Sequence, residues 1–190
     1  MAVNNKYRFF ILTGEPGVGK TTLIKKLCSL LGSKGLKTSG FYTEEIRKNK
    51  VREGFDVVTL DGVRGRLARE KSLLENPVKY NVGKYGVLVQ EFQDIALHSL
   101  INTTEPQLLV IDEIGKMEFF SQAFKSRTRY IFSENTNDIV LATVPLRTKD
   151  QLIESIKNNK FSKVWTVTRE NRNTIHKEIL QDICSTFNLA

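Results

Sequence analysis

The sequence predicts an α/β fold in which a mostly parallel β-sheet lies between two layers of helices. Three observations support this expectation. Short apolar runs alternate along the chain with longer segments whose apolar residues recur at helical spacing. A glycine-rich segment joins the first apolar run to the first of these helices. The segment at about residues 40–90 instead has the pattern of antiparallel strands, and we expect it as a β-ribbon inserted at one side of the sheet.

The glycine-rich segment has the spacing of a phosphate-binding loop (P-loop). Residues 7–13 (YRFFILT) are aromatic and β-branched, as suits a buried strand, and residues 22–31 carry leucines and an isoleucine at helical spacing. Residues 14–21 between them read G-x-x-x-x-G-K-T. This strand–loop–helix context predicts a three-layer P-loop fold and a site for a nucleoside triphosphate.

The residue types in the loop explain how it would hold phosphate. Glycines let successive backbone N–H groups turn toward an anion, and the helix that follows adds its positive dipole end. Lys20 supplies a mobile charge for the β and γ phosphates, and the Thr21 hydroxyl can ligate Mg²⁺. We expect the Glu15 carboxylate to turn toward solvent or a basic neighbour. The expected phosphate-binding residues are Gly14, Glu15, Pro16, Gly17, Val18, Gly19, Lys20, Thr21 and Thr22.

A second part of the site is predicted at residues 108–113 (LLVIDE), which fit a Walker B pattern. Four consecutive apolar residues suit a parallel strand buried on both faces, and its carboxyl end is where open α/β sheets bind ligands. We expect Asp112 to hold Mg²⁺ through water. Glu113 could orient and deprotonate the water that attacks the γ phosphorus, although kinases place their base elsewhere and acidic turns often end strands.

Two later strands end in polar residues that could reach the phosphates. Residues 139–142 end at Thr143, whose hydroxyl could contact the γ phosphate or the attacking water, or simply bond to nearby backbone. Residues 164–168 lead to Arg169 and Arg172. Either arginine could act as an arginine finger, and ordinary surface roles compete equally because Thr168 or Asn171 could cap a helix at about residues 172–187.

The formal net charge of +8 is concentrated in the expected ribbon. Residues 46–71 hold eight basic and four acidic residues, a net charge of +4. Strand-like segments at residues 39–46 and 54–60, with turn signals at residues 48–50 and 61–62, predict antiparallel pairing. We favour a solvated ribbon that attracts the anionic nucleotide over a nucleic-acid surface, because no basic pattern interleaved with aromatic residues is present.

The rest of the chain continues the alternation. We expect a strand at residues 85–89 and helices at residues 92–101, 119–132 and 148–158, the last with a capping box between Thr148 and Gln151. Apolar runs are too short to span a bilayer, no signal-peptide core is present, and Cys28 and Cys184 are expected as buried free thiols. We therefore expect one soluble, cytoplasmic P-loop domain over residues 1–190, with no membrane partner and as a monomer.

Several segments together closely resemble the family of the cancer-related and thermophile nucleoside triphosphatases. They are TGEPGVGKTTLI from Thr13, GFYTEEIR from Gly40, GFDVVTLDG from Gly54, LLVIDEIGKMEFFS from Leu108 and TVTRENRN from Thr166. The resemblance implies a Mg²⁺-dependent enzyme that hydrolyses ATP, GTP, CTP and UTP to the diphosphate and phosphate with low base specificity. It also extends the nucleotide-binding residues to Leu108, Leu109, Val110, Ile111, Asp112, Glu113, Ile114 and Gly115.

The residues alone leave two other activities open. A small-molecule or nucleotide kinase would use the same phosphate cradle, with the ribbon as a lid that keeps water out. A nucleic-acid-coupled ATPase would use the basic ribbon as a nucleic-acid surface, and we favour this partner less. We assign Lys20 and Glu113 as the catalytic residues, with Arg169 and Arg172 as further nucleotide contacts.

Overall fold

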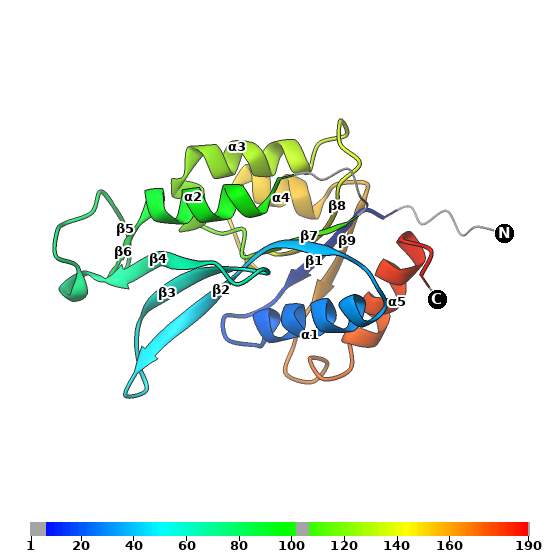
Figure 1. Cartoon of the computed structure of the whole chain (residues 1–190), viewed down its shortest axis with the longest axis horizontal. Helices are drawn as coiled ribbons and strands as arrows, with labels where there is room; N and C mark the ends of the chain where they lie inside the picture. Colours follow the sequence, from blue (N-terminus) through cyan, green and yellow to red (C-terminus); the bar gives the residue numbers. More distant parts are fainter. Residues whose placement is uncertain (1–6, 102–106, 190) are drawn as a thin grey trace.

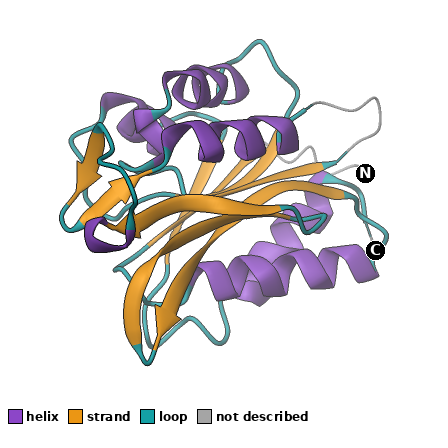
Figure 2. Cartoon of the chain, turned by 60° about the vertical axis from the view of Figure 1, so that its left-hand side comes forward, coloured by secondary structure: helices purple, strands orange, loops and turns teal. Residues whose placement is uncertain are grey.

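The computed structural model describes residues 7–101 and 107–189 and contains one nine-stranded sheet (Figures 1 and 2). Its strand order is β5-β6-β4-β3-β2-β7-β8-β1-β9. The strands are β1 Phe9–Thr13, β2 Thr38–Lys48, β3 Val51–Thr59, β4 Arg64–Glu70, β5 Tyr80–Val82, β6 Tyr85–Val87, β7 Leu108–Asp112, β8 Ile139–Thr143 and β9 Ser162–Thr166.

The sheet has a parallel part and an antiparallel part that share strand β2. Strands β2, β7, β8, β1 and β9 pair in parallel, whereas β3, β4, β6 and β5 continue the sheet beyond β2 in antiparallel pairs. The predicted ribbon is therefore a direct extension of the central sheet, and in Figure 1 it projects away from β1, β8 and β9. The α/β fold predicted from the sequence is confirmed.

Helices cover the sheet on both faces (Figure 2). Helices α1 and α5 lie on one face and α2, α3 and α4 on the other (Figure 1). Their bounds are α1 Lys20–Ser33, α2 Val89–Ser99, α3 Gln122–Ile131, α4 Gln151–Lys157 and α5 His176–Thr186, with single 3₁₀ turns at Lys71–Leu73 and Glu118–Phe120. Within the described ranges, no helix has the length and apolar character needed to cross a bilayer.

Two apolar cores explain why the central strands are apolar at every position. In β1, Phe9 and Ile11 belong to the core under α2, α3 and α4, whereas Phe10 and Leu12 belong to the core under α1 and α5. All four side chains are fully buried. A strand with one exposed face alternates apolar and polar residues, whereas a strand buried on both faces is apolar at every position. That continuous apolar run is the pattern that predicted this strand.

The ribbon is anchored to the helix layer by an aromatic cluster. The rings of Phe41 on β2, Phe92 on α2 and Phe124 on α3 pack edge to face, with centroid separations of 5.1 to 5.7 Å. All three are fully buried. Such pairs add stabilisation of about 0.5–1.5 kcal/mol each beyond the burial of their area, so this cluster holds β2 in place at the junction between the two parts of the sheet.

The ribbon turns lie where the sequence predicts them. Asn49 and Lys50 both have positive φ, 49° and 67°, as a two-residue turn with the twist of a hairpin requires. Gly62, with φ 97°, turns the chain between β3 and β4.

Two helix starts differ from the sequence-based expectation. Helix α4 is capped by Asp150, whose Oδ1 accepts a hydrogen bond from the Leu152 N–H at 2.9 Å, and the Thr148 hydroxyl accepts from the Asp150 N–H at 3.0 Å instead of capping the helix. The predicted capping box is therefore wrong, because a carboxylate one residue before the helix is the better placed acceptor. Helix α5 begins only at His176, since Thr168 and Asn171 bond to each other and hold residues 168–171 in a turn.

The two cysteines are free thiols, as predicted, but only one is fully buried. Cys184 is buried and Cys28 is partly exposed. Burial raises the pKa of Cys28 to about 11, with a smaller contribution from the charge of Asp112. A thiol with this pKa is protonated at neutral pH and is a weak nucleophile.

Candidate functional site

The parallel part of the sheet brings three predicted site segments to one edge. Strand β8 lies between β1 and β7, and its residue Thr143 pairs with Leu12 of β1, while Ile111 of β7 pairs with Ala142. The backbone of Asp112 is therefore level with Thr143 and only two strands from the start of the P-loop. With neighbouring strands about 4.8 Å apart, long side chains on either segment can reach a ligand held between them.

The P-loop wraps around the amino end of α1, and its backbone conformation depends on glycine. Gly14, Gly17 and Gly19 have φ of 150°, 72° and 109°. A Cβ on Gly14 would lie 2.4 Å from the Val167 carbonyl oxygen, so a side chain there would force the loop away from strand β9. The amides of this loop are thereby left in the conformation that suits an anion nest.

Lys20 is folded back over the loop. Its Nζ donates hydrogen bonds to the carbonyl oxygens of Gly14 at 3.0 Å and Glu15 at 3.3 Å, and the residue is only 9% exposed. No carboxylate within the described ranges forms an ion pair with it. Because its partners among the described residues are neutral carbonyls, no carboxylate competes with phosphate for Lys20.

Asp112 is buried at the base of the site. Its Oδ1 accepts a hydrogen bond from the Thr143 hydroxyl at 2.5 Å, while its Oδ2 is buried without a hydrogen-bond partner among the described residues. Burial raises the pKa of Asp112, and the Thr143 and Thr21 side chains and the charge of Lys20 act in the opposite direction. Thr143, expected to contact the phosphate or water or to bond to backbone, is instead bonded to Asp112.

The orphaned oxygen is an observation that fits a divalent cation. A buried carboxylate oxygen without a partner is costly, and Mg²⁺ prefers oxygen ligands while keeping several waters and phosphate oxygens. Asp112 Oδ2 and the Thr21 hydroxyl are the two protein oxygens that fit this role. Both are oxygen donors from segments 91 positions apart that the sheet brings together.

Glu113 follows Asp112 at the same edge and lines the cleft. Burial raises the pKa of Glu113, the charge of Lys20 opposes this rise, and the charge of Asp112 adds to it. A carboxylate whose pKa is raised from its ordinary value is a stronger base, and general bases work best when their pKa approaches the working pH. The environment of Glu113 therefore suits proton abstraction from water.

A second carboxyl, Glu118, lies beside Glu113 and was missed in the sequence analysis. Glu118 is 5% exposed, and its pKa is raised to about 8 by burial and by the charge of Glu113. A Cβ on Gly115 would lie 2.9 Å from Glu118 Oε2 and 3.2 Å from Glu113 Oε1, so glycine at this position leaves room for both carboxyls. The sequence did contain a sign of this residue, because Glu118 stands among apolar residues in the segment that begins at Leu108. Its spacing from Glu113 did not show that the two carboxyls lie side by side.

A cleft of about 900 Å³ joins these groups. It is bounded by the P-loop and α1 on one side, by residues 43–45 of β2 and the first half of β3 on another, and by the loops that follow β7 and β8. The predicted residues that line it are Gly14, Glu15, Pro16, Gly17, Gly19, Lys20, Thr21, Thr22 and Glu113. Residues not predicted also line it, including Lys25, Arg52, Lys116, Glu118 and Arg147.

The remaining predicted residues, which include the buried Asp112 and Gly115, do not line the cleft. Val18, the β7 residues Leu108 to Ile111, and Ile114 are buried in the apolar cores and support the site from beneath. Arg169 and Arg172 are exposed and do not line the cleft. The Arg172 side chain lies next to the P-loop without lining the cleft. A Cβ built on Gly19 would be 3.9 Å from the Cδ of Arg172.

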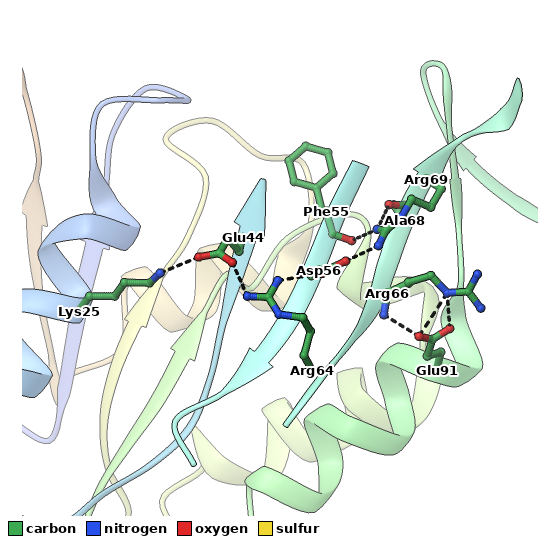
Figure 3. Close-up of polar contacts among 9 residues, drawn as sticks. All are labelled: Lys25, Glu44, Phe55, Asp56, Arg64, Arg66, Ala68, Arg69 and Glu91. Carbon is green, nitrogen blue, oxygen red and sulfur yellow. Dashed lines mark hydrogen bonds and ion pairs between the residues drawn. The ribbon is translucent and has the colours of Figure 1, made fainter. Parts of the chain in front are cut away.

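The basic ribbon has its charges largely neutralised within the protein (Figure 3). All five arginines at residues 46–71 contact a carboxylate: Arg47 and Arg52 contact Glu45, Arg64 contacts Glu44 and Asp56, Arg66 contacts Glu91, and Arg69 contacts Asp56. Three of the partner carboxylates, Glu44, Glu45 and Glu91, lie outside this segment. The net charge of the segment therefore overstates its attraction for an anionic polymer.

Comparison with known proteins agrees with this geometry. A model of the protein family described as NTPase matches residues 9–180. The chain is 45% identical over 183 residues to the human cancer-related nucleoside-triphosphatase, covering 91% of this chain and 95% of that protein. It is 42% identical over 171 residues to nucleoside-triphosphatase THEP1 of Thermotoga maritima, covering 90% of this chain and 92% of that protein. The crystal structure of THEP1 from Aquifex aeolicus superposes with a TM-score of 0.79 at 36% identity, over 91% of this chain and 97% of that one.

Proposed function

This chain belongs to the NTPase family, and on that premise we propose that its cleft hydrolyses nucleoside triphosphates to the diphosphate and phosphate. The observation that carries the proposal is the juxtaposition of a glycine-rich anion nest with two carboxylates, the buried Asp112 and the partly buried Glu113, across one inserted strand. A phosphate cradle and a base are the parts that γ-phosphoryl transfer to water requires.

In the proposed mechanism the P-loop amides and Lys20 hold the β and γ phosphates in line for attack. Glu113 accepts a proton from water as the water oxygen forms a bond to the γ phosphorus. The bond from the γ phosphorus to the bridging oxygen breaks, and its electron pair passes to the β phosphate. Thr143 orients Asp112 by donating to Oδ1, which leaves Oδ2 without a hydrogen-bond partner among the described residues.

We further propose that Thr21 and Asp112 bind Mg²⁺ together with the triphosphate. When bound, the cation supplies positive charge to the β and γ phosphoryl oxygens. The residues proposed to contact phosphate meet groups that ATP, GTP, CTP and UTP share. Low base specificity follows from this, because these contacts do not discriminate among bases.

The test is phosphate release by the purified chain from each of the four triphosphates with Mg²⁺. We expect release of free phosphate from all four without any added acceptor, and loss of release when the metal is removed by a chelator. Strict dependence on an added acceptor would instead identify a kinase. Stimulation only in the presence of RNA or DNA would identify a nucleic-acid-coupled ATPase.

A further inference from the structure

The cations that line the cleft differ in whether the protein already neutralises them. Lys25 donates to Glu44 at 2.9 Å and Arg52 donates to Glu45 at 2.5 Å. Lys116 and Arg147 also line the cleft, but neither forms a hydrogen bond or ion pair with any residue in the ranges 7–101 and 107–189. Apart from Lys20, whose hydrogen-bond partners are backbone carbonyls, these two side chains are therefore the cleft cations that no carboxylate of the described residues neutralises.

The backbone around Arg147 is fixed although its side chain is exposed. On one side, the Val144 N–H donates to the Leu12 carbonyl at 2.9 Å, which ties the loop to the strand that leads into the P-loop. Lys157 Nζ donates to the Leu146 carbonyl at 3.1 Å. On the other side, Asp150 caps α4 and pairs with Lys125 at 2.5 Å. A charged side chain on a loop held at both ends can be aimed without ordering the loop during the reaction.

We propose that Arg147 contacts the γ-phosphoryl group and stabilises the charge that develops on it during hydrolysis. This inference rests on the proposed function of the same cleft. Arg147 forms and breaks no covalent bond: the proton of the attacking water goes to Glu113, and the electron pair of the broken bond goes to the β phosphate. The planar guanidinium fits two phosphoryl oxygens at once, which the point charge of Lys116 cannot do.

The geometry favours Arg147 over the arginines suggested by the sequence. Arg169 and Arg172 lie in the turn after β9 and do not line the cleft, whereas Arg147 follows β8, the strand that separates the P-loop strand from the strand of Asp112. Arg52 lines the cleft but is held by both oxygens of Glu45. Of the described arginines that line the cleft, Arg147 alone can take a phosphate oxygen without first leaving a carboxylate.

The test compares Arg147→Ala and Arg147→Lys with Arg129→Ala, which removes an exposed arginine of α3 outside the cleft. Four quantities are measured for each variant. Two are kcat and KM for Mg²⁺·ATP, and the other two are the affinities for a non-hydrolysable ATP analogue and for ADP with aluminium fluoride, which mimics the transferring phosphoryl group. We expect Arg147→Ala to lower kcat by about 10²- to 10³-fold and the aluminium fluoride complex to weaken in parallel. Affinity for the ATP analogue should change by less than about fivefold.

Arg147→Lys should restore part of kcat, and Arg129→Ala should match the parent protein. Parental kcat in Arg147→Ala would overturn the inference, as would a loss of analogue affinity as large as the loss of kcat. The inference would also be overturned if Lys116→Ala lowered kcat and Arg147→Ala did not. The role would then belong to Lys116. If the parent protein itself releases no phosphate, it is the proposed function that fails, which separates the two outcomes.

Discussion

The nucleotide cleft and the β-ribbon are both rich in charge, but they differ in how that charge is satisfied. In the ribbon, the Asp56 carboxylate pairs with Arg69 at 2.5 Å and with Arg64 at 2.8 Å, and the network continues through Glu44 to Lys25 of α1 (Figure 3). In the cleft, counting the described residues, Lys20 has only carbonyl partners and Asp112 keeps one oxygen without a hydrogen-bond partner. Paired charges stabilise a fold, whereas unpaired ones are available to a ligand.

This contrast also argues against the ribbon as a nucleic-acid surface. Its arginines already donate hydrogen bonds to carboxylates. The hydrogen bond from Arg64 lowers the pKa of Glu44 most, and the hydrogen bond from Lys25 lowers it further. A phosphate backbone would have to compete with these carboxylates for the arginines. We therefore expect changes in the cleft to affect turnover and changes in the ribbon to affect stability.

The largest expected effect is that of Glu113→Gln on turnover. The amide cannot accept the proton of water, so kcat should fall by about 10³-fold while affinity for Mg²⁺·ATP is retained. Steady-state phosphate release and calorimetric titration measure the two quantities. Glu134→Gln, at an exposed residue paired with Lys160, is the matched control. Parental kcat in Glu113→Gln would exclude this residue as the base.

Asp56→Asn should produce the largest effect in the ribbon. It removes the charge shared by Arg64 and Arg69 at a residue that is only 6% exposed, and it leaves the Arg64 side chain (44% exposed) and the Arg69 side chain (18% exposed) without this carboxylate. We expect the free energy of unfolding to fall by about 2 kcal/mol in urea titrations, with kcat per folded molecule unchanged. Glu53→Gln, in the same strand and without a charged partner among the described residues, should change neither quantity. A loss of kcat without a loss of stability would break the contrast between the two regions.

Lys20→Ala should mainly weaken binding. Removing a charge-assisted contact to the β and γ phosphates should reduce affinity for Mg²⁺·ATP by about 30-fold, and turnover should fall with it. The control is Lys26→Ala on the same helix, whose lysine does not line the cleft. Equal affinities in Lys20→Ala and Lys26→Ala would show that the loop is not where phosphate binds.

Glu118→Gln should change the pH dependence of stability. The pKa of Glu118 in the folded protein is about 8, above its ordinary value of 4.5. Between these values the folded state keeps a proton that the unfolded state releases, so stability falls as pH rises toward 8. Between pH 6 and pH 7 the parent should lose about 1.4 kcal/mol relative to Glu118→Gln, which has no proton to release. The free energy of unfolding is measured for both proteins by urea titration at each pH. If it changed with pH in the same way in both, the raised pKa of Glu118 would be contradicted.

The sequence predicted the parts of the molecule that depend on local pattern. The P-loop was identified because its strand, glycines and helix are contiguous, and β1, β7 and β8 because burial on both faces leaves an apolar run. Asp112 followed from its position at a strand end.

What the sequence did not predict depends on contacts between distant segments. The bond from Thr143 to Asp112 joins residues 31 positions apart and requires knowing that β8 inserts between β1 and β7. The neutralisation of the ribbon was missed because a charge count along the chain excludes Glu91 on α2. Arg147 carries no motif, and only the shared cleft brings it near the P-loop.

A crystal structure of Glu113→Gln with Mg²⁺ and ATP would test the central claim most directly. We predict that the β and γ phosphates lie on the amides of residues 14–20 with Lys20 beside them. We also predict that the metal lies within reach of Thr21 and Asp112, and that the Glu44, Arg64 and Asp56 pairs remain intact. A triphosphate bound along the ribbon, or a metal held away from Asp112, would contradict the assignment of the cleft as the site of hydrolysis.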